Sequence, residues 1–429
     1  MLRLKTSDPD FEARFARLVD DRRESDAEVA HAVDDILDRV RDLGDEALIE
    51  YTVRFDDHRL RSDEDWRIAP ETCKQAFEAL DPKLREALEL AAERIRAYHQ
   101  DQLPRDRDFT DEAGVRLGAR WRAVDAAGLY VPGGRASYPS SLLMNAIPAK
   151  VAGVERVVIA TPTPKGEVNS LVLAAAHLVG IEEIWRIGGA QAIGALAYGT
   201  GRIAPVDVIV GPGNAYVAEA KRQLYGVVGI DMVAGPSEIL VIADGKNDPD
   251  WIAADLLSQA EHDPLAQSIL ITDDAQFAGQ VEDRIDVQCS MLSTRRTART
   301  SWDDYGVLLV VSDMSEAPAL ANRLAAEHVE LAVDDPEALF AQIRHAGSVF
   351  LGRHTPEAVG DYVAGPNHVL PTGRRARFAS GLSVLDFMKR TSFISMDAEA
   401  LGKIGPAAIA LAEAEGLPAH AKSVELRLK

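Results

Sequence analysis

The sequence predicts an α/β protein with two Rossmann-like, parallel-sheet α/β domains, a helical N-terminal segment and a helical C-terminal arm. Three observations support this fold class. The chain has 429 residues, more than one hydrophobic core usually serves, and 47% of them are apolar. From about residue 120, apolar runs of strand length alternate with helical patterns. This alternation is typical of parallel sheets with helices on both faces.

Residues 1–119 form the predicted N-terminal segment, which we expect to pack partly against the second α/β domain. Its sequence consists mostly of amphipathic helical patterns rich in Asp and Arg, for example FEARFARLVDD, DAEVAHAVDDILDRVRDLG and PKLREALELAAERIRAYHQ.

The two α/β domains are predicted at 120–236 and 237–375, with the glycine- and proline-bearing stretch 232–238 as the junction. Expected strands of the first domain are RVVIATP, IEEIWRIGG and VDVIVGPG, and those of the second are EILVIAD, SILITDD, GVLLVVSD, VELAVDD and GSVFLG. Residues 376–429 return to a helical pattern and form the predicted arm, with a helix over 397–416 that ends at Gly416.

Composition excludes several classes of protein. The formal net charge is −21, from 47 basic and 68 acidic residues, which argues against nucleic acid and anionic membranes as partners. No apolar run approaches membrane-spanning length and the N-terminus lacks a signal-peptide core, so we expect a cytoplasmic, small-molecule enzyme. Cys73 and Cys289 are too far apart in sequence to suggest a thiolate motif, so any metal should have nitrogen and oxygen ligands.

Glycine-rich loops occur three times in the first α/β domain, at 128–141, 187–201 and 210–217. The first and third follow predicted strands and precede helices, where backbone N–H groups can hold a phosphate or pyrophosphate. None matches G-x-G-x-x-G followed by a ribose-binding acidic residue. Tight turns that pack against a sheet therefore stay open as an alternative to dinucleotide binding.

The stretch LLSQAEHD, residues 256–263, places Gln259 and His262 three residues apart. On a helix these two side chains share a face and can direct an amide oxygen and an imidazole nitrogen at one metal ion. A solvated or hydrogen-bonded Gln–His pair has the same spacing, so the motif alone does not decide between them.

Glu327 and His328, in AAEHVEL, stand at the end of a predicted helix just before a strand. In a helix-to-strand turn the two side chains can converge near the strand ends where α/β sites form, and the imidazole can transfer protons near neutral pH. The alternative is a histidine at a helix C-terminus beside a solvated glutamate.

Further candidates lie in loops and in the arm. Asp361 and His368 belong to the Gly/Pro/Asn-rich stretch GDYVAGPNHVLPTG, and His420 lies in GLPAHAK. The gathered candidates are Gln259, His262, Asp361 and His420, a mixed nitrogen and oxygen set that suits Zn²⁺ or a similar ion. Spacing alone does not select that set.

Long strings of the sequence resemble, in the same order and over nearly the whole chain, those of bacterial histidinol dehydrogenases. The similarity is closest from about 128 to 395. The strings are GLYVPGGRASYPSSLLMNAIPAKVAGV, GGAQAIGALAYGTG, VDVIVGPGNAYVAEAKRQLYG, GIDMVAGPSEILVIAD, DLLSQAEHDPLAQSIL, EHVEL, GPNHVLPT and SGLSVLDFMKRTSF.

The resemblance implies NAD-dependent, zinc-containing oxidation of L-histidinol to L-histidine through the aldehyde, the last steps of histidine biosynthesis, by a homodimer with shared active sites. By similarity, Glu327 and His328 are the catalytic pair. The zinc ligands would be Gln259, His262 and Asp361, with His420 from the other subunit. The substrate-binding residues would be Ser237, Gln259, His262, His328, Asp361, His368, Glu415 and His420, and the NAD contacts Tyr130, Gln191 and Asn214.

Departures from the family pattern are small. This chain has Ala326 and Val329 around the catalytic pair where relatives tend to have Pro and Leu, and it carries Arg135 in the first glycine-rich loop. Neither change removes a functional group, although Arg135 can alter how the loop meets a cofactor phosphate.

The expected mechanism assigns His328 as the base for the alcohol and Glu327 as the group that activates water for the aldehyde step. The metal would orient the substrate imidazole and amine or, alternatively, act on the reacting oxygen. Other functions that the sequence leaves open are NAD-dependent oxidation of another small polyol, such as a sulfonated diol, and a zinc hydrolase. A non-catalytic protein that keeps the fold is a third.

Overall fold

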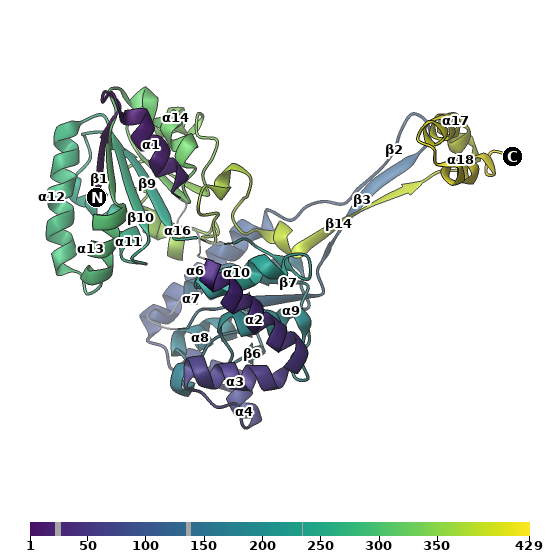
Figure 1. Ribbon diagram of the computed structural model, residues 1–429, viewed down its shortest axis with the longest axis horizontal. Helices are drawn as coiled ribbons and strands as arrows, with labels where there is room; N and C mark the ends of the chain where they lie inside the picture. Colours follow the sequence, from purple (N-terminus) through teal and green to yellow (C-terminus); the bar gives the residue numbers. More distant parts are fainter. Residues whose placement is uncertain (22–26, 134–138, 234) are drawn as a thin grey trace.

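The structure is a computed structural model that describes residues 1–21, 27–133, 139–233 and 235–429. Figure 1 shows two α/β domains in contact and an arm that projects from the body of the molecule. The N-terminus lies in the second α/β domain and the C-terminus at the tip of the arm (Figure 1). Among the described residues, no helix has the length and apolar content needed to cross a membrane.

The first α/β domain is built on a five-stranded parallel sheet with strand order β6-β5-β4-β7-β8. Alternate residues of the strands face opposite sides: Leu129 packs with one set of helices, whereas Ile209 packs with the other. The elements are β4 (Ala126–Tyr130), α7 (Pro139–Ala152), β5 (Arg156–Ala160), η1 (Pro164–Gly166), α8 (Ser170–Leu178), β6 (Glu183–Trp185), α9 (Gly189–Tyr198), β7 (Val208–Val210), α10 (Ala215–Leu224) and β8 (Gly229–Ile230).

The N-terminal segment divides between the two domains. Its helices are α1 (Phe11–Asp20), α2 (Ala27–Leu43), α3 (Asp45–Asp56), α4 (Asp63–Trp66), α5 (Pro70–Glu78) and α6 (Pro82–Gln100). Helices α5 and α6 pack with α7 and α8, and α2 to α4 pack with α9, so both faces of the first sheet are covered. Strand β1 (Leu2–Lys5) and α1 belong to the second domain, where β1 pairs with β11.

The second α/β domain contains a six-stranded parallel sheet with strand order β1-β11-β10-β9-β12-β13. The central strand β9 is buried at every residue, which explains why its sequence, EILVIA, is almost continuously apolar. The elements are β9 (Glu238–Ala243), α11 (Pro249–Ala260), β10 (Gln267–Thr272), α12 (Ala275–Met291), α13 (Arg295–Tyr305), β11 (Val307–Val310), η2 (Met314–Glu316), α14 (Ala317–Leu324), β12 (His328–Ala332), α15 (Pro336–Phe340), β13 (Ser348–Leu351) and α16 (Glu357–Tyr362). The two parallel sheets confirm the predicted fold class.

The arm consists of a long antiparallel sheet that carries two helices at its tip (Figure 1). The sheet was not predicted, because its strands have charged residues on exposed faces and lack a buried apolar side. Gly118 is required where β3 pairs with β14, since a Cβ there would collide with the ring of Phe393, the residue opposite it. The elements of the arm are β2 (Arg107–Thr110), β3 (Arg116–Ala123), β14 (Met388–Ser395), α17 (Ala398–Ala414) and α18 (Pro418–Glu425). Two short helices precede β14, η3 (Arg375–Arg377) and η4 (Val384–Phe387), and η4 packs into the core of the first domain.

Candidate active site

The candidate site lies at the amino ends of β9 and β12 in the second sheet. Glu238 is the first residue of β9 and His328 the first of β12, and the two strands are paired neighbours. Ligands in open α/β sheets usually bind at the carboxyl ends of the strands. The prediction that Glu327 and His328 lie near the strand ends therefore needs a correction: they occupy the opposite edge from the one that this rule indicates.

A strained turn brings the chain from α14 into β12. Ala325, which follows the helix, has the left-handed conformation with φ 46°, and its N–H donates to the Ala321 carbonyl at 2.7 Å. An alanine in this region costs about 1 kcal/mol. The turn places two acid–base side chains directly against the start of β9.

Both of these side chains are anchored to Glu238. The Glu327 carboxylate accepts a hydrogen bond from the backbone N–H of Glu238 at 3.0 Å. Nδ1 of His328 lies 3.1 Å from the carbonyl oxygen of Glu238, which fixes Nδ1 as the protonated, donating nitrogen. Nε2 of His328 is therefore the nitrogen that carries a lone pair.

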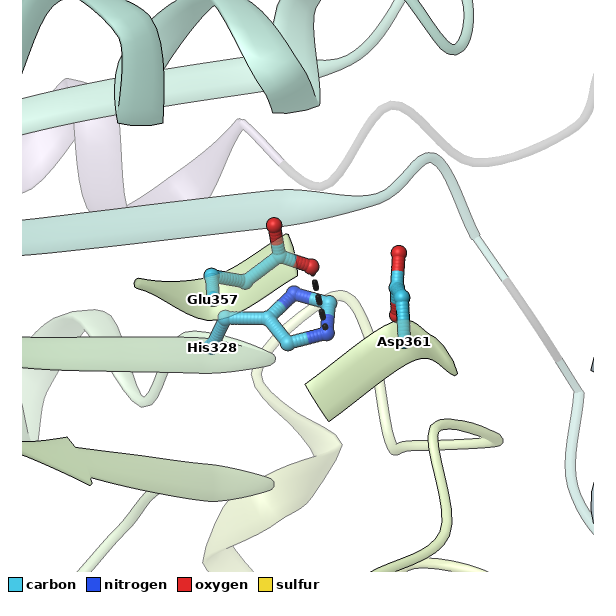
Figure 2. A group of neighbouring side chains, drawn as sticks. All are labelled: His328, Glu357 and Asp361. Atoms are coloured by element: carbon cyan, nitrogen blue, oxygen red, sulfur yellow. Dashed lines mark ion pairs between the residues drawn. The ribbon is translucent and has the colours of Figure 1, made fainter. Parts of the chain in front are cut away.

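Nε2 of His328 faces two carboxyl groups on α16. Oε1 of Glu357 lies 3.6 Å from it, and ligand atoms of His328, Glu357 and Asp361 all lie within 4.8 Å of one another (Figure 2). Among the described residues, neither Nε2 nor Oε1 of Glu357 has a hydrogen-bond partner. Buried polar atoms without partners are rare in folded proteins, so this group has capacity for a ligand.

Glu357 is the site residue that sequence reasoning missed. It is the first residue of α16 and lies four positions before Asp361, so both carboxyl groups share one helical face. Its side chain is buried, and Ser258 of α11 donates a hydrogen bond to its Oε2 at 3.3 Å. The four-residue spacing of two acids was the available signal, although a glutamate in the first turn of a helix is usually explained by the helix dipole.

Burial determines the charges of the group. It raises the pKa of Glu327 well above its usual value and raises the pKa of Glu357 to about 8, with Asp361 adding to the second shift. It lowers the pKa of His328 to about 4, so the imidazole is neutral at pH 7. Burial opposes ionisation of Asp361 as well, but the hydrogen bond and charge of His368 keep the pKa of Asp361 below its usual value.

His368 connects Asp361 to the first domain. Its Nδ1 lies 3.0 Å from the carbonyl oxygen of Asp361 and 3.4 Å from Oδ1 of the same residue. Its Nε2 lies 3.2 Å from Oγ of Ser141, which belongs to α7 after the carboxyl end of β4. The amino edge of the second sheet thus meets the carboxyl edge of the first sheet at this site.

Gln259 and His262, the predicted ligand pair, stand at the end of α11 on the border of the site. Gln259 is 1% exposed, and neither atom of its amide has a hydrogen-bond partner in the described part of the chain. His262 is exposed in the turn after α11, close enough for its charge to lower the pKa values of His328 and Asp361. The available donors are nitrogen and oxygen atoms, which suit zinc and similar divalent ions.

The three residues expected to contact NAD lie at the carboxyl edge of the first sheet. The hydroxyl of Tyr130, at the end of β4, accepts from the N–H of Gly189 at 3.1 Å. Gln191, on α9, is 1% exposed, and its Oε1 has no partner among the described residues. Asn214 caps α10 by accepting from two backbone N–H groups at 3.1 Å. Arg135, which was expected to affect the nucleotide pose, lies outside the described residues.

The remaining predicted residues lie apart from one another. Ser237 immediately precedes Glu238 and so borders the site, and its carbonyl accepts from Gln267 at 2.9 Å. Glu415 and His420 are exposed near the ends of α17 and α18, at the tip of the arm and away from the second domain of the same chain (Figure 1). One chain alone does not bring these two residues to His328.

The chain is similar to known proteins along its whole length. Residues 19–428 match the family model described as histidinol dehydrogenase. A histidinol dehydrogenase from Zymomonas mobilis is 60% identical over 428 residues, with 100% of this chain and 99% of the relative covered. One from Rhodospirillum rubrum is 61% identical, with 100% and 98% covered. The crystal structure of histidinol dehydrogenase from Elizabethkingia anophelis has a TM-score of 0.94 at 35% identity, with 100% and 98% covered.

Proposed function

The chain belongs to the histidinol dehydrogenase family and is an NAD-dependent oxidoreductase of histidine biosynthesis; we propose that Glu327 and His328 perform its proton transfers. The substrate is L-histidinol, and the product is L-histidine. The observation that carries the assignment is the state of the buried His328. Its Nδ1 donates a hydrogen bond to the carbonyl of Glu238, and its Nε2 has no hydrogen-bond partner among the described residues.

The residues present fit the zinc ion of this family. Gln259 has a buried amide without a hydrogen-bond partner among the described residues, and Asp361 is a half-buried carboxylate whose pKa His368 holds below its usual value. We propose that Gln259, His262 and Asp361 hold the ion, with His420 of the partner subunit as the fourth ligand. When bound, the ion supplies a positive charge that orients the imidazole and amine of the substrate and offsets the surrounding carboxylates.

The first domain offers a matching place for NAD. The unpartnered Oε1 of Gln191 and the hydroxyl of Tyr130 lie at the same sheet edge as the start of α10, where Asn214 is found. We propose that these three residues contact the nucleotide, and when bound, NAD⁺ accepts the hydride of each oxidation step. Because Ser141 joins this edge to His368, the nucleotide and the substrate would meet between the domains.

In the first oxidation, His328 takes the hydroxyl proton of L-histidinol on Nε2. The ring is unprotonated at pH 7, so Nε2 has a lone pair for the proton, and the hydrogen bond from Nδ1 to Glu238 stabilises the imidazolium against the burial that lowers the pKa of His328. The alcohol loses this proton and a hydride, which gives the aldehyde. Oε1 of Glu357 lies 3.6 Å from Nε2, where the negative charge of its ionised form would also stabilise the imidazolium.

In the second oxidation, Glu327 activates the water that adds to the aldehyde. Burial raises the pKa of its carboxyl group, which makes Glu327 a stronger base than an exposed glutamate. The imidazolium of His328 returns its proton to the aldehyde oxygen as the water adds, which gives the hydrate and restores the neutral ring. The hydrate then gives up a second hydride, and His328 accepts the proton of the hydroxyl that becomes the carbonyl of L-histidine. Each substrate molecule therefore reduces two NAD⁺.

We further propose a homodimer in which each arm completes the site of the other chain. Glu415 and His420 project from the tip of an arm that extends away from its own body (Figure 1). The arm exposes large apolar side chains, with Ile394 66% exposed and Leu411 65% exposed. Apolar residues at this exposure, gathered on a projecting element, are typical of a surface that is covered in an assembly.

Glu327→Gln tests the assignment. Metal-replete wild-type protein should form two NADH per L-histidinol. In the variant, we expect oxidation of L-histidinal to fall by about 10²–10⁴-fold, because it lacks the base for water. Oxidation of L-histidinol, measured with an aldehyde trap, should fall much less. Glu337→Gln, on an exposed helix face, is the control. Equal losses in both steps would contradict the role of Glu327.

A further inference from the structure

A fully buried ion pair in the first domain has no part in the proton transfers described above. Lys221, on α10, pairs with Asp231, which follows β8, and their side chains are 2% and 1% exposed. Moving two charges out of water costs several kcal/mol per ion unless good geometry and further hydrogen bonds offset the loss. The partners of the pair therefore indicate what it holds in place.

The pair encloses a single backbone residue, Gly211. Nζ of Lys221 donates to the carbonyl oxygen of Gly211 at 3.1 Å. Oδ2 of Asp231 accepts from the N–H of Gly211 at 2.8 Å, and its Oδ1 accepts from the N–H of Met232 at 2.6 Å. Both hydrogen-bonding groups of Gly211 are thus satisfied by one ion pair.

Gly211 occupies a position that fixes its surroundings. Its φ of 115° is a conformation that other residues rarely adopt, and a Cβ would collide with the carbonyl oxygen of Tyr130. Three residues later, Asn214 caps α10, the helix that carries Lys221. The hydrogen bonds that Lys221 and Asp231 make with Gly211 therefore determine how the loop 211–214 lies between Tyr130 and the start of α10.

We propose that Lys221 and Asp231 are positioning residues for the nucleotide, which hold the loop 211–214 in its binding conformation before the nucleotide arrives. This inference rests on the proposed NAD contacts of Tyr130 and Asn214. A loop that is already ordered loses less conformational entropy on binding, so the affinity for the nucleotide is higher. A neutral pair of similar size would fill the same space but leave the carbonyl of Gly211 without its donor.

The double variant Lys221→Met/Asp231→Asn tests the proposal without leaving an unpaired buried charge. NADH affinity is measured by fluorescence titration in the absence of substrate. We expect the Kd for NADH and the KM for NAD⁺ to rise about tenfold, with kcat within about threefold of the wild type. Binding of L-histidinol to the zinc-loaded protein without nucleotide should be unchanged.

The matched control is Arg156→Met/Glu183→Gln. It removes another ion pair of the same sheet, with a 2.8 Å contact, at the amino end of β5. The proposal is overturned if NADH affinity is unchanged in the Lys221/Asp231 variant or if the control weakens it equally. Because NADH binding needs no L-histidinol, a failure here is distinct from a failure of the substrate assignment, which would show as no NADH from L-histidinol in the wild type.

Hydrogen exchange of the wild type gives a test that does not depend on folding of a variant. The amide of Gly211 should exchange slowly before any nucleotide is added, because Asp231 holds it, and addition of NADH should change its rate little. Exchange at the rate of an unprotected amide, followed by strong protection with NADH, would show that the nucleotide orders the loop and would overturn the proposal.

Discussion

Glu330 offers a quantitative test of the electrostatics behind the active site. It lies on β12, 1% exposed, and its carboxyl group is hydrogen-bonded to that of Asp255 on α11. Burial raises the pKa of Glu330 to about 9, with the charge of Asp255 contributing, and burial raises the pKa of Asp255 to about 6. Glu330→Gln preserves the shape and a donor for Asp255 but does not ionise.

The sign of the pH dependence follows from the raised pKa. In the unfolded chain Glu330 ionises near its usual pKa of 4.5, whereas in the fold it stays protonated up to about pH 9. Its contribution to stability is therefore complete below about pH 4.5 and declines as the pH rises toward 9. Each pH unit in this window changes the free energy of unfolding by at most about 1.4 kcal/mol.

From pH 5 to pH 8 the upper bound on this loss is about 4 kcal/mol, and we expect about 2 kcal/mol because the interior responds to charge with an effective dielectric well above that of dry protein. Glu330→Gln should gain stability over the wild type by this amount across the same range. Urea unfolding of chelator-treated protein at fixed concentration measures the difference, with the exposed Glu89→Gln as the control. A stability difference that is constant with pH, or that favours the wild type as the pH rises, would refute the reasoning.

Two further predictions concern the neighbours of Asp361. Glu357→Gln should weaken zinc binding by about tenfold, because one buried carboxyl group near the ion is lost. Competition with a chelator measures this change. Unchanged zinc affinity would show that Glu357 does not interact with the ion. Ser141→Ala removes the hydroxyl that contacts Nε2 of His368 and should lower kcat/KM a few-fold. The free energy of unfolding should change by about 1 kcal/mol or less. A normal kcat/KM in this variant would show that the contact between the domains does not position Asp361.

The fold was predictable where burial left a simple pattern in the sequence. Parallel strands that are covered on both faces, such as β9, are continuously apolar and stand out between helices. The antiparallel strands of the arm were missed because β3 and β14 are largely exposed and contain several charged residues. Their pairing joins residues 116–123 to 388–395, a contact that no local pattern in the sequence indicates.

The site was predictable only in part, because its residues meet through the fold. The spacing of Gln259 and His262 suggested that both side chains contribute to one site from the end of a helix. Ser258 of the same helix end donates a hydrogen bond to Glu357, which places that end at the site. Glu357 was not predicted because it is far from His328 in the sequence, although Oε1 of Glu357 and Nε2 of His328 lie 3.6 Å apart in the fold. The roles of these residues stay predictions, as does the place of His420, which depends on a second chain.

Mixing two inactive variants tests most directly the claim that one active site is built from two chains. Glu327→Gln disables the body of a chain, and His420→Asn disables its arm. If arms are exchanged, a mixed dimer has one intact site, so unfolding and refolding the mixture together should restore about a quarter of the wild-type L-histidinal oxidation, given random pairing of the chains. Activity that stays at the level of the separate variants would show that each chain uses its own arm and would contradict the account.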